Sequence, residues 1–376
     1  MGATTSNDGG FAALESRVQS NPFRQIDPAK PVWIFGAGSF AQDLARAMRA
    51  RGIEVAGFVE TVPGKTSALG LDVVDWKTLA SREKQAQLAL GMFNHRHSFD
   101  KVVRIPVEAG FQVPLMPWEL YEQFGDQLGW RYWLGRRDVL TRNLARLART
   151  AEGFADEISR QVLFRTCAFR LGLDLDYSSH VSEGSQYFNE ITLPVLAGRS
   201  IVYLDCGAYN GDTYIDLQSR PGVRCSQAFL LEPDPANFSE LVSRVSTLHS
   251  SAICLPLAAA ETYSILTFSS DGTSSAIGAN GDVHIAAVAV DELLPGGTVD
   301  LIKMDVEGAE ARVLRGARQT ILRNRPVLAV SLYHNPQDLW ELPELLSDLC
   351  RDYRFYIRQH CFNSFELVLY AVPEWR

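Results

Sequence analysis

The fold of the second half of this 376-residue chain is decided by one stretch, Val202-Tyr203-Leu204-Asp205-Cys206-Gly207-Ala208-Tyr209-Asn210-Gly211-Asp212-Thr213. An apolar run ends in an aspartate, a turn with two glycines follows, and a helical pattern begins at Thr213. A buried strand, a tight turn and a helix in that order open a βαβ unit. Ligands of such units bind beyond the carboxyl ends of the strands, so this turn predicts a binding site.

The same alternation of strand and helix continues to the C-terminus. It predicts an α/β fold with a doubly wound, Rossmann-like sheet, in which 264–269 and 284–290 form an inserted hairpin or edge pair. Helices are expected from Thr213, over 235–245, 309–322 and 342–350. Strands are expected at 201–205, 228–231, 253–257, 300–304, 327–332, 355–359 and 365–371.

Two acidic residues end neighbouring strands, Asp205 and Glu232. Asp205 is expected to organise the loop and face an amino group of the ligand. Glu232 is expected to accept hydrogen bonds from both ribose hydroxyls, as acidic residues do in dinucleotide sites. Gly207 and Gly211 lack the Cβ that would collide with a closely bound ligand. A nicotinamide-dinucleotide loop and a mere packing turn are the alternatives. The G-x-G-x-x-G fingerprint is missing from this turn, which favours another nucleoside-type ligand.

A second motif lies downstream, Ile302-Lys303-Met304-Asp305-Val306-Glu307-Gly308-Ala309-Glu310. It resembles the K-x-D-x-E-G-x-E signature of the FkbM-type S-adenosylmethionine-dependent methyltransferases. The resemblance covers most of the second half of the chain. It extends to Leu231–Pro235, to the turn 272–275, to Val290–Leu293, and to Ser331–His334 with Asp338–Pro343.

The resemblance implies a class I methyltransferase domain that binds S-adenosyl-L-methionine. It implies O-methylation of a small-molecule or glycan acceptor, a hydroxyl on a carbohydrate or secondary metabolite. The adenine is expected against the backbone of Ala258 and Ala259, while Gln186 and Tyr187 cover the donor, unless Tyr187 is a core aromatic. The other expected donor contacts are Asp205, Gly207, Ala208, Gly211, Asp212, Thr213, Glu232 and Pro233.

Asp305, Glu307 and His334 are the candidate catalytic residues. Methylating an alcohol needs positioning and proton removal, and His334 suits a general base because imidazole titrates near neutral pH. Each has a structural alternative. His334 would then only support the site, Asp305 would be a solvated charge, and Glu307 would cap the following helix. The nearby Glu310 would form an ion pair with Lys303.

No metal is expected at this motif. Two carboxylates and a histidine can hold Mg²⁺, but octahedral oxygen sites usually show more carboxylates.

The first half of the chain contains another Rossmann-like unit. The strand 32–35 leads into Gly36-Ala37-Gly38-Ser39-Phe40-Ala41, a helix over 42–51 and a strand ending at Glu60. Further strands are expected at 71–74, 87–92 and 113–116, with a helix over 97–109. The unit also resembles the small domains that precede sugar acetyltransferases. Scaffolding, glycan or sugar-nucleotide binding, or homo-oligomer contacts are its expected uses, in preference to a redox role. The cluster Asn94–His97 is either part of a site or an exposed loop.

The predicted boundaries are a flexible tail with one short helix over 1–28, the small α/β domain over 29–128, a helical connector over 129–195, and the methyltransferase domain over 196–376. The tail is polar at its start, and the connector shows apolar residues at helical spacing.

Composition excludes several classes. The net charge of −8 argues against a broad nucleic-acid-binding face, because phosphate contacts need clustered Lys and Arg. Six scattered cysteines indicate reduced thiols and a cytoplasmic location. No apolar run reaches the length of a membrane span, so no membrane insertion is expected. The alternative to an enzyme is a scaffold protein whose methyltransferase fold has lost its activity.

Overall fold

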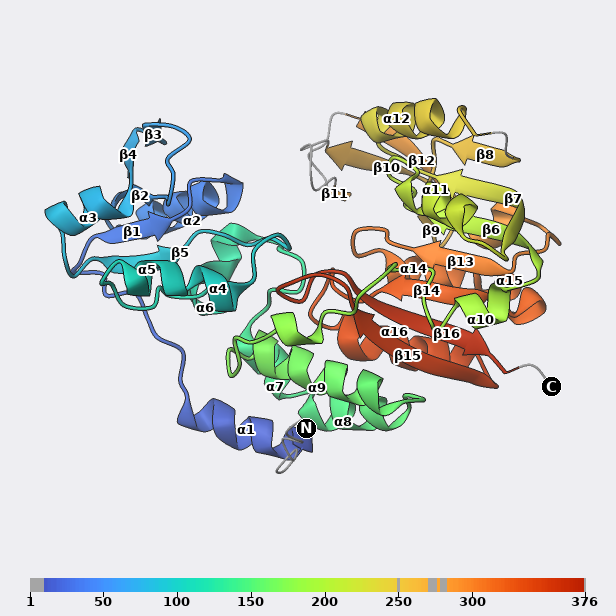
Figure 1. Ribbon diagram of the computed structural model, residues 1–376, viewed down its shortest axis with the longest axis horizontal. Coiled ribbons are helices and arrows are strands. Elements are labelled where there is room, and N and C mark those ends of the chain that lie inside the picture. Colours follow the sequence, from blue (N-terminus) through green and yellow to red (C-terminus); the bar gives the residue numbers. More distant parts are fainter. Residues whose placement is uncertain (1–9, 249–250, 270–275, 278–282, 375–376) are drawn as a thin grey trace.

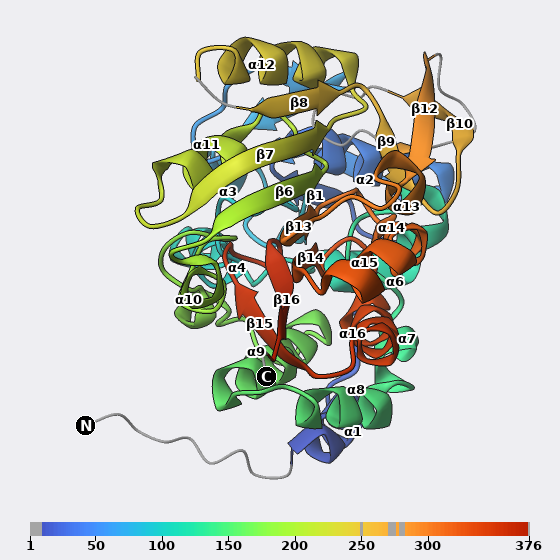
Figure 2. The same cartoon turned by 90° about the vertical axis from the view of Figure 1, so that its right-hand side faces the viewer.

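The computed structural model describes residues 10–248, 251–269, 276–277 and 283–374. Figure 1 shows an N-terminal α/β domain, a helical connector and a larger C-terminal α/β domain, and Figure 2 shows the same arrangement from the side. The predicted fold class is confirmed. No helix within the described ranges is long and apolar enough to cross a membrane. The turn predicted at 272–275 lies outside the described residues.

The first domain is a sheet in the order β3-β4-β2-β1-β5, in which β1, β2, β4 and β5 run parallel. A further strand was predicted at 113–116, but Leu115 forms only an isolated bridge to Ala89. Pro114 has no N–H to donate, and Pro117 already begins the next helix. The elements are β1 Val32–Phe35, α2 Ser39–Ala50, β2 Val55–Val59, β3 Ser67–Ala68, β4 Leu71–Val74, α3 Trp76–Arg82, β5 Gln87–Leu90, α4 Phe99–Val102, α5 Arg104–Glu108 and α6 Pro117–Leu128.

The segment expected as a flexible tail is packed where the structure describes it. Helix α1, Gly10–Ser20, lies against α8 and α9 of the connector, and Leu14 on it is fully buried. Arg24 then forms an ion pair with the buried Glu119 at 2.5 Å. The polar residues at the start of the chain suggested a flexible tail, but the apolar residues of α1 form a face that packs against the connector. The connector comprises α7 Arg137–Thr141, α8 Leu144–Glu152, α9 Glu157–Arg170, a 3₁₀ turn Ser178–His180 and α10 Leu193–Leu196.

The C-terminal domain contains a seven-stranded sheet in the order β15-β16-β14-β13-β6-β7-β8. Strands β14, β13, β6, β7 and β8 are parallel, and β16 runs antiparallel to both β14 and β15. The parallel strands therefore end at one edge, with β6 between β13 and β7. Figure 2 shows α14–α16 on one face of the sheet and α10 and α11 on the other.

The expected hairpin is present as a second, four-stranded sheet in the order β11-β10-β12-β9. The elements of this domain are β6 Ser200–Cys206, α11 Asp212–Ser219, β7 Arg224–Leu231, α12 Pro235–Val245, β8 Ala252–Leu255, β9 Ala258–Ala260, β10 Ser264–Ser269, β11 Ala276–Ile277, β12 Val283–Ala289, α13 Val290–Leu293, β13 Leu301–Met304, α14 Glu310–Gly316, α15 Arg318–Asn324, β14 Val327–Ser331, α16 Asp338–Leu349, β15 Tyr353–Gln359 and β16 Leu367–Pro373.

Candidate functional site

The loop after β6 is sharply curved. Gly207, Tyr209 and Gly211 have φ angles of 89°, 48° and 80°. A Cβ on Gly207 would lie 1.9 Å from the carbonyl oxygen of Asp305, and one on Gly211 would lie 2.8 Å from Leu241 Cδ1. Both glycines are therefore required by contacts within the protein. That these two glycines also let a ligand approach the loop stays a prediction.

Asp205 is fully buried beneath this loop. Its Oδ1 lies 3.0 Å from Lys303 Nζ, and its Oδ2 accepts a hydrogen bond from Tyr203 Oη at 2.8 Å. Lys303 also donates to the Gly207 carbonyl. Burial alone would lower the pKa of Lys303, but Asp205 outweighs it and raises the pKa, so the lysine stays charged. Asp205 is thus linked to the loop through Lys303, and its contact with an amino group of the ligand stays a prediction.

The remaining loop residues lead into α11 and α12. Ala208 is buried, and its N–H donates to the Leu231 carbonyl at 2.8 Å. Asp212 begins α11 and accepts a hydrogen bond from the N–H of Thr213 at 2.7 Å. Pro233 separates Glu232 from Asp234, the N-cap of α12. These contacts hold the ends of β6 and β7 together.

Glu232 follows β7 and is buried, with 6% of its surface exposed. One carboxylate oxygen accepts from the N–H of Tyr209 and the other from the N–H of Asp234, at 2.8 and 2.9 Å. The side chain of Asn237 is a further donor to this carboxylate, whose four lone-pair positions are not all used by these three donors. Burial raises the pKa of Glu232 to about 7, although the two amides oppose the shift. Glu232 is therefore a buried acceptor at the mouth of the loop.

The residues expected around the donor's base come from two other segments. Ala258 and Ala259 lie in β9, which pairs in parallel with β12. Their side chains are buried. Tyr187 is also buried, and its hydroxyl donates to Asp305 Oδ2 at 3.4 Å. Gln186 donates to Glu366 Oε2 at 2.7 Å. The structure therefore brings Gln186 and Tyr187 to the Asp305 side of the site, and Tyr187 belongs both to the core and to the site.

Asp305, Glu307 and His334 come together beyond β13 and β14. His334 is fully buried, and its Nε2 lies 3.5 Å from Asp305 Oδ1 and 3.6 Å from Glu307 Oε2. Glu310 Oε1 lies 2.9 Å from Nδ1 of the same ring. Tyr333 Oη donates to Asp305 Oδ1 at 3.2 Å. The sequence thus identified three groups that the fold places in one cluster.

The surroundings of His334 differ from those of a solvent-exposed imidazole. Burial alone would lower its pKa, but Glu310, Asp305 and Glu307 outweigh it and raise the pKa to about 10. The ring is also closed off from solvent, so a role for His334 as the base that takes a substrate proton stays a prediction. The prediction rested on the ordinary pKa of histidine, and three nearby carboxylates change it.

Two of the alternative roles also differ from expectation. Glu310 pairs with His334 and accepts from the N–H of Val306 at 3.0 Å, while Lys303 pairs with Asp205. The N-cap of α14 is Ala309, so Glu307 does not cap this helix. Its side chain is instead 40% exposed, the most open of the three carboxylates around His334.

Glu366 is a member of the cluster that sequence reasoning missed. It precedes β16, has a φ angle of 54°, and its pKa is raised to about 7 by burial and by Asp305. A charged residue before an apolar strand was its only signal. Its nearness to Asp305 depends on β16 returning antiparallel beside β14.

The first domain contacts the C-terminal domain near this cluster, at Asn363. Asn363 accepts from the N–H of Phe99 at 2.9 Å and donates to the carbonyls of Asn94 and His97, each at 2.8 Å. The Asn94–His97 cluster therefore contacts the C-terminal domain through its backbone, while His95 lies beside the ring of Phe365.

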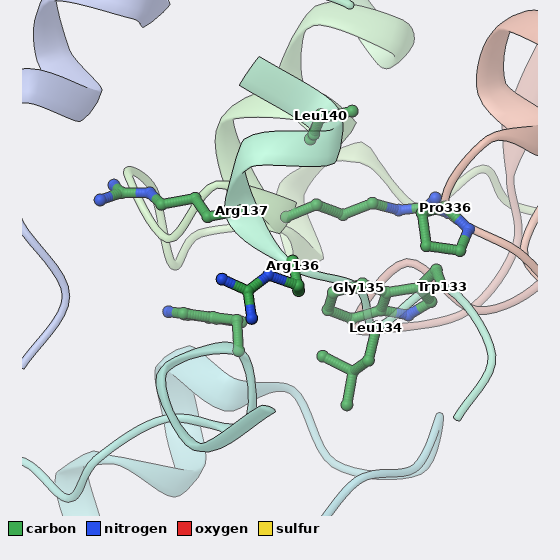
Figure 3. Close-up of a pocket in the computed structure, with 9 residues that line it drawn as sticks. Trp133, Leu134, Gly135, Arg136, Arg137, Leu140 and Pro336 are labelled. Carbon is green, nitrogen blue, oxygen red and sulfur yellow. The ribbon is translucent and has the colours of Figure 1, made fainter. Parts of the chain in front are cut away.

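The connector reaches the loop after His334. Trp130 Nε1 donates to the His334 carbonyl at 3.0 Å, and the ring of Tyr132 lies 6.1 Å from that of His334. Figure 3 shows Pro336 beside Gly135, where an added Cβ would be 2.6 Å from Pro336 Cγ. The connector is thus fitted closely to the site.

The glycine turn of the first domain is closed by its own acidic residue. Glu60 accepts from the N–H of Ala37 and of Gly64, each at 3.2 Å, and Lys65 Nζ donates to the Ala37 carbonyl at 2.9 Å. Glu60 therefore holds this turn, and its role toward a nucleotide stays a prediction.

Comparisons with known proteins agree with this architecture. Residues 205–362 match the family described as the methyltransferase FkbM domain. The structure of methyltransferase FkbM from Methylobacillus flagellatus KT is similar over 97% of this chain and 98% of that one, with a TM-score of 0.75 and 22% identity. That likeness extends through the first domain and shows a shared fold.

Partial similarities are weaker. Aeropyrum pernix fibrillarin in complex with S-adenosyl-L-methionine is 18% identical over 48% of this chain and 70% of that one, with a TM-score of 0.32. A perosamine N-acetyltransferase mutant from Caulobacter crescentus, in complex with CoA and GDP-perosamine, is 27% identical over 22% of this chain and 39% of that one, with a TM-score of 0.19. No curated protein sequence matches significantly. The C-terminal half of this chain thus contains a domain, residues 205–362, that matches the methyltransferase FkbM family.

Proposed function

We propose that the protein transfers the methyl group of S-adenosyl-L-methionine to a hydroxyl of a carbohydrate or secondary-metabolite acceptor. One observation carries the proposal. The parallel strands β6, β7 and β13 end at one edge of the sheet, where the Gly207–Gly211 loop lies between Glu232 on one side and Asp305 with Glu307 on the other. This arrangement supports a donor site at Glu232 beside a proton-accepting site at Asp305 and Glu307.

The donor side fits the methyl donor. Glu232 is a buried carboxylate whose lone pairs are not all used, suited to accept from the ribose hydroxyls. The loop is fixed by the buried pair of Asp205 and Lys303. The backbone contacts proposed for Ala258 and Ala259 complete this side, while Gln186 and Tyr187, proposed to cover the donor, reach it from the Asp305 side. When bound, the donor supplies a methyl group on a cationic sulfur. An alcohol oxygen would attack the methyl carbon in line, and the sulfur would leave as the neutral thioether of S-adenosylhomocysteine.

The acceptor side requires a group that takes the hydroxyl proton. We assign that role to Glu307 with Asp305, because their side chains are 40% and 24% exposed while His334 is closed off. Tyr187 and Tyr333 hold the two oxygens of Asp305 through hydrogen bonds. His334 then acts as a positioning residue between the carboxylates.

Two experiments test the proposal in order. Calorimetry with S-adenosylhomocysteine should show one site, and Glu232→Gln should weaken it strongly. Transfer of labelled methyl to hydroxylated glycans should then fall in Glu307→Gln, with donor affinity unchanged. Absence of binding would favour the scaffold alternative, and labelling of amines in preference to hydroxyls would refute O-methylation.

A further inference from the structure

We propose that His334, Asp305 and Glu307 bind a divalent transition-metal ion. The Nε2 atom of His334 is fully buried and has no hydrogen-bond partner among the described residues, yet it faces Asp305 Oδ1 at 3.5 Å and Glu307 Oε2 at 3.6 Å. A buried polar atom without a partner is costly, so a group that fills the space between these three atoms would stabilise the site.

The spacing suits ligands of a common ion. Two ligand atoms that each lie about 2.1 Å from an ion are about 3.4 Å apart in tetrahedral coordination and about 3.0 Å apart in octahedral coordination. The separations at His334 Nε2 are near the tetrahedral value. Asp305, Glu310 and His334 also offer ligand atoms that lie within 4.8 Å of one another.

Glu310 provides the support that such a histidine needs. It lies 2.9 Å from Nδ1, on the side of the ring away from Asp305 and Glu307. A carboxylate at one ring nitrogen orients a metal-bound histidine and presents the other nitrogen to the ion. Glu310 is therefore assigned to positioning, and Nε2 to the metal.

The charge of the cluster calls for a cation. Two flanking cations are already engaged, because Lys303 pairs with Asp205 and Arg170 donates to Ser364 Oγ and the Leu332 carbonyl. The sequence suggested too few carboxylates for a metal, but the fold gathers five around His334: Asp305, Glu307, Glu310, Asp338 and Glu366.

The mixed ligand set selects the kind of ion. One imidazole with two carboxylates favours Mn²⁺ or Zn²⁺ over Mg²⁺, which prefers oxygen ligands and keeps several waters. An ion there would polarise a bound hydroxyl beside Glu307. This site extends the proposed methyl transfer, but its occupancy is measurable without donor or acceptor, so the two proposals can fail separately.

Electron paramagnetic resonance of the full chain, freed of metals and titrated with Mn²⁺, tests the site. We expect one bound Mn²⁺ per chain, with electron-spin-echo modulation from a histidine nitrogen. Asp305→Asn and Glu307→Gln should each weaken Mn²⁺ binding at least tenfold. His334→Gln should remove the nitrogen modulation. Glu157→Gln, which alters an exposed carboxylate on α9, should leave both unchanged.

The titration also gives the outcomes that overturn the site. Failure to bind Mn²⁺, binding without nitrogen modulation, or equal affinity in the wild type and in both carboxylate variants would each refute it. The carboxylate variants keep the test decisive if His334→Gln does not fold. Displacement of Mn²⁺ by equimolar Mg²⁺ would likewise refute the nitrogen ligand, whereas displacement by Zn²⁺ is expected.

Discussion

Lys303 Nζ and Asp205 Oδ1 lie 3.0 Å apart across β13 and β6, with 5% and 0% of their side chains exposed. The pair joins β13 to the loop that follows β6, because Lys303 also donates to the Gly207 carbonyl. A buried charge that loses its partner is strongly destabilising.

Replacing Lys303 with Met should therefore cost about 3–5 kcal/mol, because Asp205 is left buried and unpaired. Urea unfolding measures this difference. Glu374→Gln, which breaks the exposed pair with Arg354, is the control and should cost less than about 1 kcal/mol. The double variant Asp205→Asn/Lys303→Met should lose less than the sum of the single variants. Strict additivity would contradict a coupled pair.

Gly207→Ala should destabilise the fold and abolish donor binding, because the new Cβ would lie 1.9 Å from the Asp305 carbonyl oxygen. Gly222→Ala is the matched control. Gly222 has a similar φ angle of 82°, but nothing lies within 4 Å of its added Cβ. The control should cost about 1 kcal/mol through backbone strain alone, and Gly207→Ala at least about 2 kcal/mol more. Equal thermal shifts in the two variants would show that the contact with Asp305 does not matter.

Affinity for S-adenosylhomocysteine should rise with pH through about 7, where burial places the pKa of Glu232. The ionised carboxylate accepts hydrogen bonds from hydroxyls better than the acid does. From pH 6 to pH 8 the ionised fraction grows from about one tenth to about nine tenths, so a gain of up to about tenfold is expected in calorimetry. Glu232→Gln should bind weakly with a flat profile, and Glu374→Gln should retain the wild-type profile.

Glu232 should also make the free energy of unfolding depend on pH. The pKa of Glu232 is raised on folding from 4.5 to about 7, so the folded state binds the proton more tightly. The stability it contributes is complete below pH 4.5 and is lost as the pH rises through 7. Glu232→Gln should flatten this part of the unfolding free-energy curve. An unchanged slope would place the titration on another group.

Asn363→Asp should loosen the first domain from the methyltransferase domain. The variant keeps an oxygen that accepts from the Phe99 N–H but loses both donors to Asn94 and His97. The lost bonds and the two unpaired carbonyls should cost about 2–3 kcal/mol. Hydrogen exchange should increase in the Asn94–Phe99 segment, while α12, which lies outside this contact, keeps the wild-type protection. Unchanged exchange in both segments would contradict the clamp.

The sequence by itself determined the elements that local pattern encodes. An apolar run followed by an acidic residue predicted the ends of β6, β7 and β13, and thereby Asp205, Glu232 and Asp305 at one edge of the sheet. That inference works because parallel strands in a βαβ series end on the same side, so position along the chain fixes position in space.

Only the tertiary structure decided what each of these groups touches. Gly207 and Gly211 face Asp305 and Leu241. Lys303 forms its ion pair with Asp205 and not with Glu310. His334 is surrounded by carboxylates from three segments of the chain. Helix α1 and the Asn94–His97 turn are ordered by partners more than a hundred residues away. Ionisation and burial depend on such distant neighbours, because charge and desolvation act through space and not along the chain.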